Sequence, residues 1–165
     1  MTTAPVSGTA TAEVLAPLAR AGAVHEHLHS DSFSLSAHGS SVAQARHRVG
    51  KILADWDVPA ALRDDVALIL SELFTNALIH TDSAQIVCRC LAAPHVVYLS
   101  VTDQGSGPTG PRIRPRDPAE CDDEHGRGLL LVSAVAHTWG VSTDPGRGRT
   151  VWAVLSQERN SYPVV

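Results

Sequence analysis

Two neighbouring apolar segments joined by a very short turn constrain this fold more than any other feature of the chain. The stretches "AQIVCRCLA" (84–92) and "HVVYLSVTD" (95–103) are rich in strand-forming residues, and the short turn at Ala93-Pro94 joins them. A connection this short holds two strands side by side in opposite directions. Near the end of the chain, "HTWGVST" and "RTVWAVLS" flank a Pro-Gly turn in the same way. The sequence therefore predicts two antiparallel hairpins.

Three segments have the spacing of helices. Apolar residues recur every three or four positions from Gly39 to Trp56, and Pro59 opens a second such run that ends near His80. This period predicts two helices in succession, because residues three and four apart share one helix face. The apolar run 126–137 predicts a third helix.

The remaining segments complete the expected architecture. Alternation of apolar residues with serines after Asp31 predicts a first strand, and the Pro- and Gly-rich stretch 104–125 is interpreted as a lid. The order strand, helix, helix, hairpin, lid, helix, hairpin predicts an α+β two-layer sandwich, a mostly antiparallel sheet with its helices on one face. Residues 1–29 show no sustained period, so we expect a mobile N-terminal arm followed by one domain, 30–165.

Composition narrows the classes of partner. The net charge is −4 and the basic residues form no run, which disfavours nucleic acid. The apolar runs fall short of the roughly 20 residues that span a bilayer, so we expect no membrane partner and a cytoplasmic protein. The three cysteines, Cys88, Cys90 and Cys121, lack a C-x-x-C pair and are expected to be reduced thiols. A metal site at His25, His27 and His29 is a minor alternative, since no carboxylate or cysteine cluster follows.

The helix predicted from Pro59 to His80 carries an unusual polar stripe. Glu72 and Asn76 lie one turn apart beside the apolar face, and Asp65 falls in the same sector. One interpretation is a solvated helix edge. The other is a concave site, because an amide oxygen beside a carboxylate suits a hydrated Mg²⁺ ion together with a proton acceptor.

The second hairpin strand ends in a polar, glycine-rich motif. In "VTDQGSG", Asp103 is followed by Gly105 and Gly107. Such a motif is also a common way to end a strand, because Asp and Gly favour turns. As a site, Asp103 offers an acceptor to the amino group of a flat base, and the glycines let the main chain approach that base closely.

A third motif, "EHGRGLLLV", places Gly126 and Gly128 at a predicted helix start with Arg127 between them. Unpaired amides and the positive end of the helix dipole make such a terminus a natural phosphate site, although a plain glycine-rich loop is an equal alternative. The dinucleotide fingerprint is not met, because Leu131 stands at its third glycine, and no G-x-x-x-x-G-K-[ST] loop exists in a chain whose one lysine is Lys51.

In this order the three motifs resemble the GHKL ATP-binding domain shared by DNA gyrase, the large heat-shock chaperones, histidine kinases and mismatch-repair ATPases. The resemblance covers residues 30–156, with Glu72 to Ala77 as the N box, Asp103 to Gly107 as the first glycine box and Gly126 to Leu129 as the second. Thr150 looks like the threonine that joins the acid in holding adenine.

Within that superfamily the small size and the forms "SELFTNALIHT", "HGRGLLLV" and "TVWAVL" are most similar to the bacterial anti-sigma-factor serine kinases. The resemblance implies binding of ATP and Mg²⁺, with Asn76 as a magnesium ligand, Glu72 as the catalytic base and Asp103 on the adenine amino group. The other nucleotide-binding positions that it implies are Gly105, Gly107, Gly126, Arg127, Gly128, Leu129 and Thr150.

The implied partners are a sigma factor and a small antagonist protein that is phosphorylated on serine, commonly with the kinase as a homodimer. The alternative function is a non-catalytic ATP-binding module that sequesters a partner. One departure stands out: Arg149 precedes Thr150 where a lysine, glycine or threonine is more usual.

Overall fold

The computed structural model describes residues 28–105, 127–144, 146 and 148–157. Every helix and strand predicted from the sequence has a counterpart within these ranges. In chain order the elements are β1 (His29–Ser36), α2 (Ser41–Asp55), α3 (Ala60–His80), β2 (Gln85–Ala93), β3 (Val96–Asp103), α4 (Arg127–Val135), β4 (Thr138–Asp144) and β5 (Gly148–Ser156).

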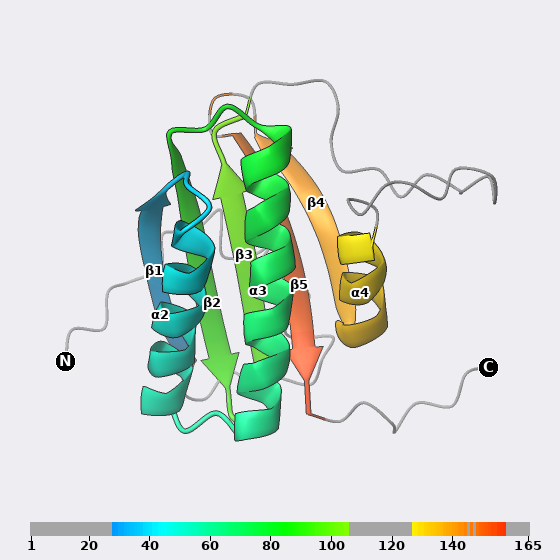
Figure 1. Ribbon diagram of the computed structural model, residues 1–165. Helices are drawn as coiled ribbons and strands as arrows, with labels where there is room; N and C mark the ends of the chain where they lie inside the picture. Colours follow the sequence, from blue (N-terminus) through cyan, green and yellow to red (C-terminus); the bar gives the residue numbers. More distant parts are fainter. Residues whose placement is uncertain (1–27, 106–126, 145, 147, 158–165) are drawn as a thin grey trace, which may run out of the picture.

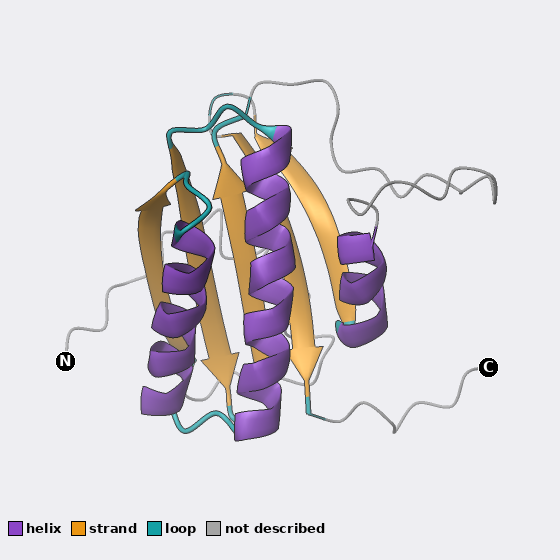
Figure 2. Ribbon diagram, in the orientation of Figure 1, coloured by secondary structure: helices purple, strands orange, loops and turns teal. Residues whose placement is uncertain are grey.

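The strands form one five-stranded sheet in the order β1-β2-β3-β5-β4, and each neighbouring pair is antiparallel. All three helices lie on the same face of this sheet (Figures 1 and 2). α3 crosses the centre of that face, with α2 on the side of β1 and α4 on the side of β4 (Figure 1). The predicted two-layer α+β architecture is therefore confirmed.

α3 is the element around which the core is organised. Pro59 precedes it in an extended conformation (φ −55°, ψ 143°), which proline tolerates well at a helix start. The helix buries one face against the sheet and α2, and each fully buried aliphatic or aromatic side chain contributes roughly 1.5–3 kcal/mol relative to an exposed one. The buried side chains are those of Leu62, Val66, Ile69, Leu70, Leu73, Phe74 and Ala77.

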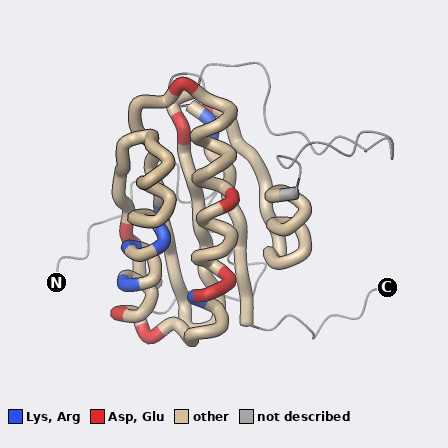
Figure 3. Tube along the Cα trace, viewed as in Figure 1, with Lys and Arg blue, Asp and Glu red and all other residues tan. Residues whose placement is uncertain are grey.

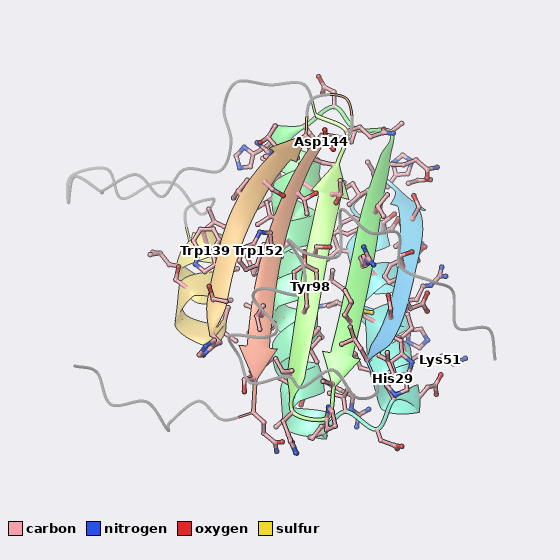
Figure 4. The ribbon with its side chains drawn as sticks, turned by 180° about the vertical axis from the view of Figure 1, so that it is seen from behind. His29, Lys51, Tyr98, Trp139, Asp144 and Trp152 are labelled. Carbon is pink, nitrogen blue, oxygen red and sulfur yellow. The ribbon has the colours of Figure 1, made fainter. Side chains whose placement is uncertain are left out.

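Side chains alternate between the two faces of the central strands. On β3, Val97, Leu99 and Val101 belong to the core beneath the helices, whereas Val96 and Tyr98 belong to a second apolar cluster. This second cluster lies on the face opposite the helices, where the Tyr98 and Trp152 rings stack with centroids 6.2 Å apart (Figure 4). Its remaining buried members are Leu91, Ala93 and Val154.

Two cysteines of β2 lie on the helix-facing side of the sheet. Cys88 and Cys90 are each 1% exposed and belong to the core, as the two-residue period predicts. Burial raises the pKa of each thiol to about 12, because the thiolate would lose its hydration there. Both side chains are free thiols, and at neutral pH they are protonated packing groups.

The first strand includes the last residue of the arm expected from the sequence. β1 begins at His29, and the His29 ring stacks on Trp56 with centroids 5.2 Å apart. The expected arm up to residue 27, Cys121, and the expected lid beyond Gly105 lie outside the described residues. In the part of the chain that the structure describes, no helix is long and apolar enough to cross a membrane.

Candidate functional site

The polar stripe predicted on α3 is present in the structure. Glu72 and Asn76 are both half-buried, and their neighbours Leu73 and Ala77 point into the core. Acidic residues occur at several levels of this helix (Figure 3), whereas Arg63 and the terminal His80 are its basic side chains. The stripe therefore combines side-chain oxygen atoms that can ligate a cation with a local excess of negative charge.

The first turn of α4 lies directly against this stripe. A Cβ atom added to Gly128 would stand 2.6 Å from Glu72 Oε2 and 3.6 Å from Asn76 Nδ2. Glycine leaves room for the Glu72 carboxylate at this close approach, because the Cβ of a larger residue would push that carboxylate aside. The carboxylate thus sits at the positive end of a helix, where the first amides point and where an anion is favoured.

The end of β3 supplies the second part of the site. Asp103 is 2% exposed and faces the helices, because it continues the row of Leu99 and Val101. Its Oδ1 accepts a hydrogen bond from the Gly105 backbone amide at 2.9 Å, and its Oδ2 accepts one from Arg149 Nη2 at 3.3 Å. A buried carboxylate is thus held in place by one amide and one guanidinium.

A hydrogen-bonded turn after α3 holds the Asp103 segment in position. The Thr81 hydroxyl donates to the Ala77 carbonyl at 2.7 Å and lies 2.8 Å from the Ser83 hydroxyl, which in turn accepts from the Gln104 amide at 2.8 Å. A Cβ on Gly105 would stand 2.6 Å from the Thr81 methyl group. Sequence reasoning assigned no role to Thr81 or Ser83. The signal was available in "HTDS", a cluster of capping residues directly after the predicted helix.

Thr150 is a predicted site residue that the structure does not bring to this face. Its hydroxyl lies 2.8 Å from that of Thr102, its partner in the sheet register, on the face opposite the helices. Adjacent residues of a strand point to opposite faces, so Arg149 and not Thr150 stands beside Asp103. Sequence reasoning identified Arg149 only as an unusual residue before Thr150 and gave it no role in the site.

The second glycine motif is described in part. Gly128 and Leu129 are buried in the first turn of α4, and Leu129 is 8% exposed. Arg127 begins the helix. Gly107, Gly126 and the Arg127 side chain lie outside the described residues, so the roles predicted for them stay predictions.

These two parts of the site lie at different levels of α3. Glu72 and Thr81 are nine residues apart, which corresponds to about 13–14 Å along a helix axis. The level of Glu72 offers its carboxylate, the Asn76 amide and the N-terminus of α4. The level of Thr81 offers the Asp103 carboxylate and close-packed backbone. The two levels are thus spaced for the anionic end and the hydrogen-bonding end of one elongated ligand.

The donor set around Asn76 fits magnesium. Within the described ranges no group of three or more His, Cys, Asp or Glu residues is placed to hold a metal ion. An ion beside Asn76 and Glu72 would therefore take most of its ligands from water and from ligand phosphates. Mg²⁺ is bound in this way, because it dehydrates reluctantly and prefers oxygen ligands.

Comparison with known proteins agrees with this geometry. The family model described as the histidine kinase-like ATPase domain matches residues 35–155, which span all three predicted motifs. A search of the curated proteins found no match to this chain.

Proposed function

The chain belongs to the histidine kinase-like ATPase domain family, and from this premise we propose that it is an ATP-dependent protein kinase that phosphorylates serine or threonine on a small regulatory protein. The family supports ATP binding at the site between α3, α4 and the end of β3. Kinase activity goes beyond ATP binding, and it is proposed because the motifs resemble those of the anti-sigma-factor serine kinases.

The observation that carries this proposal is the position of the Glu72 carboxylate. It lies on the stripe with Asn76 and within reach of the first turn of α4, so that a Cβ on Gly128 would touch it. A phosphate chain held by the amides of that turn would place its terminal group close to Glu72. A carboxylate there is suited to accept the proton of an incoming hydroxyl group.

Each residue has a separate task in the proposed reaction. Asn76 would ligate Mg²⁺, which when bound neutralises charge on the phosphates. Glu72 would orient the serine hydroxyl and accept its proton, while Asp103 holds the base and so fixes the other end of the nucleotide. Transfer of the γ-phosphoryl group would then depend mainly on positioning, since both ends of the donor are restrained.

The partners proposed for this kinase are a sigma factor, which it would sequester, and the antagonist protein that it would phosphorylate. A homodimer and a cytoplasmic location belong to the same proposal. The competing function is a module that binds ATP and a partner without transferring phosphate. The two functions differ in what Glu72 does, so a variant of Glu72 separates them.

Glu72→Gln is expected to retain ATP binding and to lose phosphoryl transfer by about a hundredfold or more, because the amide cannot accept the proton. The assay supplies γ-labelled ATP, Mg²⁺ and a lysate of the source cells, and follows label that enters serine or threonine of a small protein. Asp64→Asn is the matched control, since Asp64 is an exposed acid on the same helix. ATP binding by both proteins with transfer by neither would support the non-catalytic module.

Gly128→Ala is expected to weaken Mg²⁺–ATP binding by about tenfold, since the new methyl group displaces the Glu72 carboxylate and fills space beside Asn76. The nearest atom belongs to a flexible side chain, so little change in melting temperature is expected. The measurement is calorimetric titration beside thermal unfolding. Gly50→Ala is the control, because a Cβ there meets nothing within 4 Å and alanine favours helix. Equal ATP affinities in the two variants would contradict the proposed contact.

A further inference from the structure

The carboxylate proposed to read the base is paired with an arginine side chain. Asp103 and Arg149 are register partners on β3 and β5, and Arg149 Nη2 lies 3.3 Å from Asp103 Oδ2. Both side chains are deeply buried, with exposed fractions of 3% for Asp103 and 9% for Arg149. This ion pair joins the two central strands at the level of the predicted base subsite.

Both oxygens of Asp103 are engaged. Oδ1 accepts from the Gly105 amide at 2.9 Å, while Oδ2 accepts from Arg149. On the main-chain side, Gly148 approaches so closely that a Cβ would run into the Asp103 carbonyl oxygen. The Asp103 side chain is only 3% exposed, so a base amino group reaches its carboxylate only if one of these neighbours moves.

Arg149 is the neighbour that can move. The Gly105 amide belongs to a backbone turn that Thr81 and Ser83 hold in place, whereas a guanidinium on a flexible stem can turn outward and be hydrated. A buried carboxylate is not left without a partner, because an unpaired buried charge is strongly destabilising. Departure of Arg149 and arrival of a base amino group are therefore coupled events.

We propose that Arg149 closes the base subsite, and that a nucleotide must displace its guanidinium from Asp103 with an exocyclic amino group. This inference rests on the proposed function, because it assumes that Asp103 reads the base. Arg149 is then a specificity-determining residue. It lowers the affinity for nucleotides whose base donates an amino group to Asp103, whereas a base without that donor leaves the ion pair closed.

The test compares Arg149→Thr with the wild-type protein in calorimetric titrations of Mg²⁺–ATP. Removing the competitor is expected to tighten ATP binding by about tenfold or more, the effect of one hydrogen bond to a charged group. The empty variant is expected to melt at a lower temperature, because Asp103 loses its ion-pair partner. A purely structural role for Arg149 would lower the melting temperature without raising the affinity for ATP.

A second ligand isolates the contact with the base. Purine riboside triphosphate has the phosphates and ring of ATP but no amino group, so Arg149→Thr is expected to bind it less tightly than ATP by a wider margin than the wild type does. Arg149→Lys keeps a positive charge beside Asp103 and is expected to stay within about threefold of the wild type. Arg89→Thr is the matched control, since Arg89 lies on β2 on the opposite sheet face and is expected to leave both affinities unchanged.

The outcomes separate this inference from the function on which it rests. If the wild type binds ATP and Arg149→Thr binds it equally or more weakly, the closing role of Arg149 is overturned while ATP binding stands. An equal gain for both triphosphates would also overturn it, because the competition would then not concern the amino group. If the wild type and all variants bind neither triphosphate, the proposed function fails and this inference fails with it.

Discussion

Asn76→Ala is expected to abolish magnesium-dependent ATP binding, with an affinity at least about a hundredfold lower than that of the wild type. Asn76 lies on α3 next to the first turn of α4, with its Nδ2 3.6 Å from the Cβ position of Gly128. Within the described residues no acidic or histidine cluster is placed to hold the ion in its absence. Loss of this amide oxygen would therefore remove the proposed magnesium ligand, with no such cluster among the described residues to take its place.

The measurement is calorimetric titration of ATP with Mg²⁺ and with a chelator in its place. The wild type is expected to bind tightly only with Mg²⁺, and Asn76→Ala to bind weakly in both conditions. Gln44→Ala is the control, because it removes an exposed amide from the neighbouring helix α2. Magnesium-dependent binding that survives in Asn76→Ala would show that the ion is held elsewhere.

Gly148→Ala is expected to cause the largest loss of stability of any variant considered, about 3 kcal/mol or more in the free energy of unfolding. Gly148 has φ of +93°, a conformation that favours glycine, and its Cβ would run into the Asp103 carbonyl oxygen. That obstacle is backbone, so no side-chain rotation relieves it. The start of β5 would have to shift away from β3, and the shift would disturb Asp103 as well.

Gly146→Ala is the matched control for this variant. Gly146 also has a positive φ, +102°, but a Cβ there meets nothing within 4 Å. Its replacement is expected to cost only the backbone strain, about 1–2 kcal/mol. Urea unfolding followed by circular dichroism measures both free energies. Equal losses in the two variants would mean that strain alone, and not contact with Asp103, makes Gly148 necessary.

The elements of the fold were predictable because each depends on residues close together in the chain. The period of apolar residues marked α2 and α3, and the short turn at Ala93-Pro94 fixed β2 and β3 as an antiparallel pair. The helix spacing of Glu72 and Asn76 also placed these two side chains on one stripe. In each case the residues that determine the element lie within about two helical turns or one hairpin of each other.

The partners of Asp103 were not predictable in the same way. Arg149 lies 46 residues away in the sequence, and it faces Asp103 only because β3 and β5 pair in one particular register. A shift of one residue would have placed Thr150, and not Arg149, on the helix-facing side of the sheet. Motif matching compares residues along the chain and contains no information on which side of the sheet each residue faces.

By itself, then, the sequence determined the elements, their order, and the chemical groups available at the ends of α3 and β3. The tertiary structure decided which of those groups meet: Gly128 with Glu72, Thr81 with Gly105, and Arg149 with Asp103. The physical reason is that local elements form from short-range periodicity, whereas contacts between them depend on strand register and helix packing. Those in turn are set by burial of the whole apolar core beneath α2, α3 and α4.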